Sequence, residues 1–216
     1  MATQPISSTG TRALAGAAIG LRVHSGWAAL IALTGPLAAP EVVERRRVEL
    51  VDQASPGGAQ PYHAARALEP QAAERLLAQS RNASLRLARQ ALAATGEELR
   101  RRGQAAVACG LLQSSARPLP ELAAVLASHA LVHTAEGELF RDVLAAAGAD
   151  LGLALIRVKE REVLERCGAA LGLAAGDLHR RLDELGRALG PPWRQDEKLA
   201  TLAAWLALRQ ASPASA

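Results

Sequence analysis

The amino-acid sequence predicts an α/β domain, and three observations carry the prediction. Residues 17–51 contain three extended segments that are separated by short turns. Amphipathic helical patterns then alternate with two short apolar segments, as in proteins that pack helices against a sheet. Hydrophobic residues make up 50% of the 216-residue chain, which is enough for a sizeable core. Aromatic residues are scarce at 2%, so leucine, alanine and valine must fill that core.

The first two extended segments form a predicted hairpin. Residues 19–24 alternate between apolar side chains at odd positions and Gly20, Arg22 and His24 at even positions, the period of a half-buried strand. A turn at His24-Ser25-Gly26 precedes residues 27–34, a nearly continuous apolar run that is typical of a strand covered on both faces. Residues 42–51 supply a third strand, so the three form an antiparallel meander.

The rest of the chain alternates between helices and strands. We expect a loop over residues 54–62, then a helix from Pro70 to about residue 94 that restarts at Thr95, where Thr95 and Glu98 have capping-box spacing. Residues 105–112 predict a central strand parallel to the first, and a helix then runs from Pro118 to about residue 147 with a bend near Gly137. The remaining predicted elements are a strand at 153–158 and helices at 160–171, 177–189 and 196–208.

Composition favours a bacterial cytoplasmic protein. We expect terminal tails at residues 1–12 and 211–216 around a single domain at 13–210.

Cys109, in a predicted strand, and Cys167, near a predicted strand end, make no disulfide framework, which fits a reducing compartment. No apolar segment reaches the roughly 20 residues that span a bilayer, so we expect no membrane partner. The net charge of +4 permits a nucleic-acid partner without requiring one.

Two stretches give the chain a family resemblance. Residues 20–28, GLRVHSGWA, look like the opening of the Holliday-junction-resolvase branch of the ribonuclease H-like superfamily, and DEKLATLAAWLAL from Asp196 is similar to the last helix of that branch. The order of elements over residues 17–208 agrees. The resemblance implies a three-layer ribonuclease H-like fold, with a five-stranded mixed sheet in the order 3-2-1-4-5 and helices on both faces.

The resemblance also implies a chemistry that this sequence lacks. Nucleases of the family hold two divalent metals with carboxylates on the first strand, near the end of the fourth strand and on the last helix, because hard cations prefer oxygen ligands. Here Arg22 and His24 stand on the first strand, and residues 105–113 contain no acid. Only Asp196 and Glu197 remain, near the third position. We therefore predict that the chain is not a metal-dependent nuclease.

A second candidate site lies on the helix that follows the fourth strand. His129, His133 and Glu136 fall at i, i+4 and i+7, which places them on one helix face. Two histidines at this spacing can share a divalent metal, and the glutamate could be a third ligand or a base. The alternative is an ordinary polar helix face, and we predict no cofactor. His24 would join the group if this helix and the first strand end at the same edge of the sheet.

Two arginine clusters and one tryptophan are further candidate binding residues. Residues 45–47 and 100–102 are both Arg-Arg-Arg, and together they could bind phosphate, although edge protection and the helix dipole also explain them. Trp193 follows Gly190-Pro191-Pro192 and either packs as a lid over the core or stacks against a substrate.

Three functional hypotheses follow. The first is a non-catalytic ribonuclease H-like protein with a structural or partner-binding role, the partner being unknown. The second is a hydrolase-class enzyme that uses His24, His129, His133 and Glu136, with Arg22 and Trp193 binding the substrate. The third is a nucleic-acid-binding protein.

Overall fold

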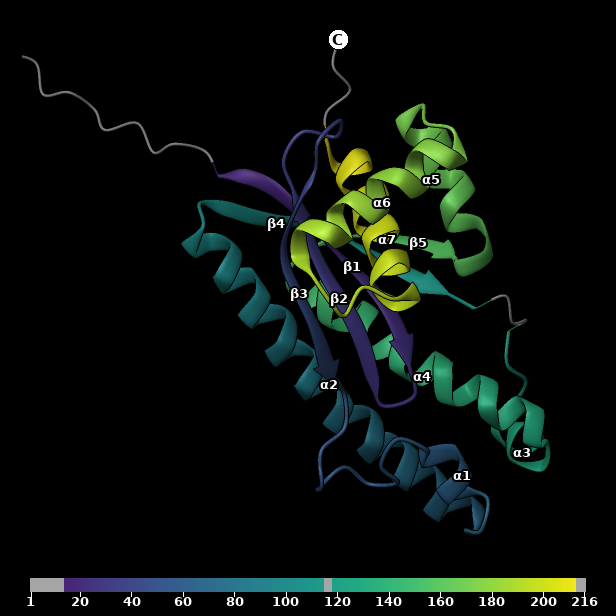
Figure 1. The fold of residues 1–216 in the computed structure, drawn as a ribbon. Helices are drawn as coiled ribbons and strands as arrows, with labels where there is room; N and C mark the ends of the chain where they lie inside the picture. The colour runs from purple at the N-terminus through teal and green to yellow at the C-terminus, as the bar shows by residue number, and fades with distance from the viewer. Residues whose placement is uncertain (1–13, 115–117, 213–216) are drawn as a thin grey trace, which may run out of the picture.

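A five-stranded mixed sheet lies at the centre of the computed structural model, which describes residues 14–114 and 118–212 (Figure 1). The strand order is β3-β2-β1-β4-β5, as the resemblance implied. β1 (Ala15–His24), β2 (Trp27–Thr34) and β3 (Glu41–Glu49) form an antiparallel meander. β4 (Gln104–Gln113) and β5 (Ala154–Lys159) extend the sheet parallel to β1. The predicted meander, the central strand parallel to the first and the fifth strand are therefore confirmed.

Helices cover both faces of the sheet (Figure 1). α2 (Pro70–Arg101) and α4 (His129–Asp150) pack on one face. α7 (Gln195–Ala211) packs on the other, and α5 (Val163–Leu171) and α6 (Ala175–Leu189) share its core cluster. Two short helices, α1 (Pro61–Ala65) and α3 (Leu122–Ala127), lie near the start of α4, and a 3₁₀ turn at Glu160–Glu162 follows β5.

The alternation along β1 decides which side chains meet which helices. Ile19, Leu21 and Val23 belong to the core cluster that contains residues of α2 and α4. Ala18 instead joins the cluster formed by α7, and Gly20 lies against the α7 backbone. Because side chains two apart in a strand share a face, Arg22 and His24 lie on the α7 face at the carboxyl end of β1.

Two glycines let α7 approach the sheet closely. Gly20 on β1 and Gly110 on β4 are register partners. A Cβ atom on Gly20 would lie 1.9 Å from the carbonyl oxygen of Ala200, and one on Gly110 would lie 2.1 Å from that of Ala203. The α7 backbone thus rests directly on the two central strands, and ten consecutive residues of the helix, 199–208, are buried.

Several element boundaries differ from the prediction. α2 is one continuous helix, so the predicted restart at Thr95 is wrong: Thr95 is fully buried within the helix, where the backbone N–H groups need no cap. The predicted bend at Gly137 is also wrong, because the break falls at Ser128, whose backbone is extended and whose hydroxyl accepts from the Leu131 N–H at 3.4 Å.

Other corrections concern short elements. Part of the predicted 54–62 loop begins helix α1, which starts at Pro61. Cys167 lies in α5 rather than near a strand end. The predicted tail at residues 1–12 lies outside the described residues. Across residues 14–114 and 118–212, no helix combines the length and the apolar composition that crossing a bilayer requires.

The close packing of α7 on Gly20 and Gly110 predicts that a larger residue at either position destabilises the protein. Gly20→Ala and Gly110→Ala should each lower the free energy of unfolding by about 1–3 kcal/mol or more, because the added methyl group overlaps backbone that cannot rotate away. Urea unfolding followed by circular dichroism measures the loss. Gly176→Ala is the matched control, since a Cβ atom there meets nothing within 4 Å, and it should stay within about 0.5 kcal/mol of the parent. Equal effects at all three positions would contradict the close approach of α7.

Candidate functional site

Polar side chains gather where β1, β5 and α7 meet. β1 ends at His24, Glu160 directly follows β5, and Asp196 lies in the first turn of α7. Because β1 and β5 both run parallel to β4, their carboxyl ends reach the same edge of the sheet, where ligands bind in open α/β folds. We call Arg22, His24, Glu160 and Asp196 the edge cluster.

Arg22 is the centre of the edge cluster. Its Nε and Nη2 donate to the two carboxylate oxygens of Glu160 at 3.3 and 3.0 Å, the forked geometry that guanidinium groups favour. Its Nη1 forms an ion pair with Oδ1 of Asp196 and lies 2.9 Å from Nε2 of His24. One protein cation therefore joins both carboxylates and the imidazole.

The His24 ring is held between the edge cluster and Trp27. The two rings are stacked with centroids 4.1 Å apart and an angle of 7° between their planes. Burial, and then the nearby positive charge of Arg22, lower the pKa of His24. A neutral ring can accept the hydrogen bond from Arg22, while Asp196 Oδ1 lies 3.0 Å from the same Nε2. Arg47 lies over the Trp27 ring at 3.9 Å from its centroid.

The residues of the edge cluster do not fit the metal pair that the resemblance implies. β1 carries no carboxylate, and β4 contains no acid along its whole length. The two acids that are present, Glu160 and Asp196, both bind the Arg22 guanidinium. Glu160 was missed by the sequence analysis because it begins a helical pattern, and only its position after a parallel strand would have marked it.

Three histidines gather at a second place, near the start of α4. His63 of α1 meets His129 and His133 of α4, and one ligand nitrogen from each ring lies within 4.8 Å of the others. The ring centroids are 4.5 Å apart for His129 and His133, 4.7 Å for His63 and His133, and 5.7 Å for His63 and His129. His63 is half-buried and the other two are exposed. We call these residues the histidine trio.

Glu136 lies behind the trio and is 1% exposed. Its Oε1 accepts from the backbone N–H of His63 at 3.0 Å and lies 3.2 Å from Nδ1 of the same residue. Burial raises the pKa of Glu136, and the hydrogen bonds from His63 oppose that rise. The buried Oε2 has no hydrogen-bond partner among the described residues.

The structure divides the predicted histidine site into two groups. His129 and His133 lie beside each other on α4, and both meet His63, which in turn contacts Glu136. His24 belongs to the edge cluster, and His63 is the third member of the trio. Sequence reasoning missed His63 because α1 has five residues, too few to show a helical period. Pro61, a typical first residue of a helix, was the available signal.

The predicted arginine clusters are largely engaged within the protein. Arg45 donates to the carbonyl oxygens of Gly190 and Pro192 at 2.7 and 2.6 Å. Arg46 pairs with Glu44 and Arg47 with Glu49, while Arg101 and Arg102 both pair with Glu98. These contacts hold most of the six side chains in place, although the three paired glutamates offset only half of the positive charge.

Trp193 sits against α6. A Cβ atom on Gly186 would lie 2.2 Å from Cδ1 of Trp193, so the indole lies directly on the glycine. This position supports the packing role for Trp193 over substrate stacking.

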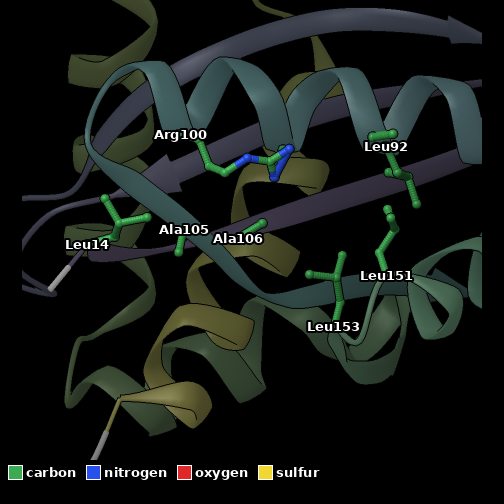
Figure 2. A pocket seen from close by; sticks show the side chains of 9 residues that line it. Leu14, Leu92, Arg100, Ala105, Ala106, Leu151 and Leu153 are labelled. Carbon is green, nitrogen blue, oxygen red and sulfur yellow. The ribbon is translucent and has the colours of Figure 1, made fainter. Parts of the chain in front are cut away.

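A cavity of about 170 Å³ lies at the opposite edge of the sheet (Figure 2). Leu14 and Ala105, at the amino ends of β1 and β4, line it together with Leu151, Leu153 and Arg100. The carboxyl ends of parallel strands are the usual ligand-binding edge, so this cavity is the weaker candidate.

Comparison with solved structures identifies the fold. No protein-family model matches the chain, and no curated protein sequence matches it. The Thermus thermophilus RuvC structure in complex with a Holliday junction substrate is 8% identical, with a TM-score of 0.51 over 88% of this chain and 90% of RuvC. This chain has a ribonuclease H-like fold. A second Thermus thermophilus RuvC structure is 11% identical over 88% of this chain and 92% of that one, with a TM-score of 0.48.

The ribonuclease H-like fold explains where the edge cluster lies. The resemblance places metal-binding carboxylates on the first strand and on the last helix, and β1 and α7 are those elements here. The edge cluster thus lies on the elements for which the resemblance implies carboxylates, with a different set of residues.

Substitution of Arg22 tests how far the edge cluster stabilises the ribonuclease H-like fold. Arg22→Met should lower the free energy of unfolding by about 1–3 kcal/mol, because it leaves the partly buried Asp196 without its cation. Arg180→Met is the matched control, since its pair with Asp177 is exposed, and it should cost about 0–1 kcal/mol. Chemical denaturation measures both. Losses of the same size would mean that the edge cluster behaves as an ordinary surface ion pair.

Proposed function

We propose that this chain is a ribonuclease H-like protein without metal-dependent nuclease activity, with a structural or partner-binding role in a bacterial cytoplasm. The observation that carries the proposal is the ion pairing of Arg22 with both Glu160 and Asp196 at the carboxyl edge of the sheet. The positively charged Arg22 side chain binds the same acids that a metal ion would need as ligands.

Electrostatics supports the proposal. Two unit charges about 4 Å apart repel by about 4 kcal/mol at an effective dielectric of about 20, and a divalent ion beside a guanidinium would experience about twice that. Moving the Arg22 side chain away would break its bonds to Glu160 and its contact with His24.

The shortage of oxygen ligands for metal ions supports the proposal independently. Two-metal catalysis needs several oxygen ligands to hold the ions that stabilise the attacking and leaving oxygens. β4 ends in Leu111, Leu112 and Gln113, so an acid is missing from a strand that the family uses.

The cysteines agree with a cytoplasmic location. Cys109 and Cys167 are both free and buried. Burial raises the pKa of each thiol to about 12, so neither is a reactive thiolate at neutral pH.

A hydrolase-class enzyme is the second candidate, and the meeting of His129 and His133 with His63, which contacts Glu136, favours it. Glu136 is the difficulty for this candidate. It is 1% exposed and bonded to His63, so it orients a neighbouring ring more readily than it reaches a substrate as a base.

Four-way DNA junctions provide the direct test of the first candidate, since the solved RuvC complex contains a Holliday junction substrate. With Mg²⁺ or Mn²⁺ present, we expect this chain to cleave labelled junctions no faster than a protein-free blank, with Thermus thermophilus RuvC measured alongside for comparison. Denaturing gel electrophoresis measures the products. Metal-dependent cleavage that disappears in Asp196→Asn would overturn the proposal.

The same DNA tests for a nucleic-acid partner. Retention that weakens steeply as salt rises would identify nucleic acid as the partner, because phosphate contacts release counterions. With most β3 arginines paired within the protein, we expect little retention at 150 mM salt, and filter binding across a salt series measures it.

A further inference from the structure

We propose that His63, His129 and His133 bind a divalent transition-metal ion of the Zn²⁺ class, with Glu136 as a positioning residue. The site lies outside the edge cluster and uses none of its residues. The metal-site proposal can therefore be tested separately from the proposal that the edge cluster has no nuclease activity.

The ligand type and the spacing fit such an ion. Neutral imidazole is a preferred ligand of Zn²⁺, with a bond of about 2.0–2.1 Å. In a tetrahedral site, ligand nitrogens then lie about 3.3 Å apart. The three nitrogens already lie within 4.8 Å of one another, and the exposed rings of His129 and His133 can close the difference by rotating.

The trio is assembled from two distant parts of the chain. His129 and His133 are one helical turn apart on α4, whereas His63 comes from α1, 66 residues earlier. The His63 backbone is fixed by its N–H bond to Glu136, and Arg66 of the same segment donates to the Leu126 carbonyl of α3 at 3.1 Å. Three of the five histidines in the chain meet at this point.

Glu136 supplies the outer contact that metal-binding histidines usually have. A ligating histidine commonly donates its second ring N–H to a carboxylate, which fixes the ring and its tautomer. Nδ1 of His63 lies 3.2 Å from Oε1 of Glu136, so a proton on Nδ1 leaves the lone pair on Nε2 for the metal.

The buried carboxylate of Glu136 also favours the binding of a cation beside it. Glu136 is almost fully buried, and among the described residues no arginine or lysine is bonded to it. A buried carboxylate without a paired charge is costly. A divalent ion held by the trio would offset that negative charge.

Three protein ligands leave one position of a tetrahedral ion open. His129 and His133 are exposed, so solvent can supply a water as the fourth ligand. The ion would tie α1 to α4 and so fasten the segment between β3 and α2 to the helical layer.

Metal titration of the full-length, tag-free chain tests the site. After treatment with a chelator, Zn²⁺ is added and binding is followed by isothermal calorimetry and elemental analysis. We expect one ion per chain and a rise in Tm on binding, because a ligand that binds the folded state stabilises it. His129→Ala and His133→Ala should each abolish stoichiometric binding, and both side chains are exposed, so the variants should fold.

His179→Ala is the matched control. His179 is an exposed histidine on α6 with Nδ1 2.8 Å from the Ala175 carbonyl, and its loss should leave Zn²⁺ binding and the Tm rise unchanged. Glu136→Gln should keep one ion per chain but weaken binding about 10- to 100-fold, the usual effect of losing such an outer partner. Absence of stoichiometric binding by the parent, or binding that survives in the double variant of His129 and His133, would overturn the proposal.

Discussion

The close approach of α7 to β1 and β4 is the constraint on which the edge of this protein depends. Gly20 and Gly110 are neighbours in the sheet, and the absence of both side chains lets the α7 backbone rest on them. The helix is fixed in depth and direction by this contact, and its first turn then brings Asp196 to Arg22 at the end of β1. A larger residue at either glycine would lift the helix and separate the two charges.

In the edge cluster, the cation that neutralises the two acids is a side chain of the protein, Arg22. Metal ions in a carboxylate site can leave, and their open positions accept substrate oxygens. A guanidinium cannot leave, and Arg22 directs its donors toward Glu160, Asp196 and His24. These bonds therefore join the ends of β1 and β5 to the first turn of α7.

Much of the fold could be predicted because its signals are local. The period of residues 19–24 assigned Arg22 and His24 to one face, and the meander followed from short turns. Only part of the edge cluster could be predicted. Asp196 lies near a position that the family resemblance marks, whereas the role of Glu160 follows only from its place directly after the end of β5. His63 could not be found this way, because a five-residue helix shows no period and its partners lie 66 residues further on.

The two polar groups differ in how their acids are neutralised, and that difference separates their roles. In the edge cluster, Arg22 bonds to both acids, so the charges balance within the protein. At the trio, Glu136 is more deeply buried, yet its only side-chain partner among the described residues is His63. A divalent ion at the trio, as proposed above, would supply the positive charge that this buried acid lacks, whereas the acids of the edge cluster already have one.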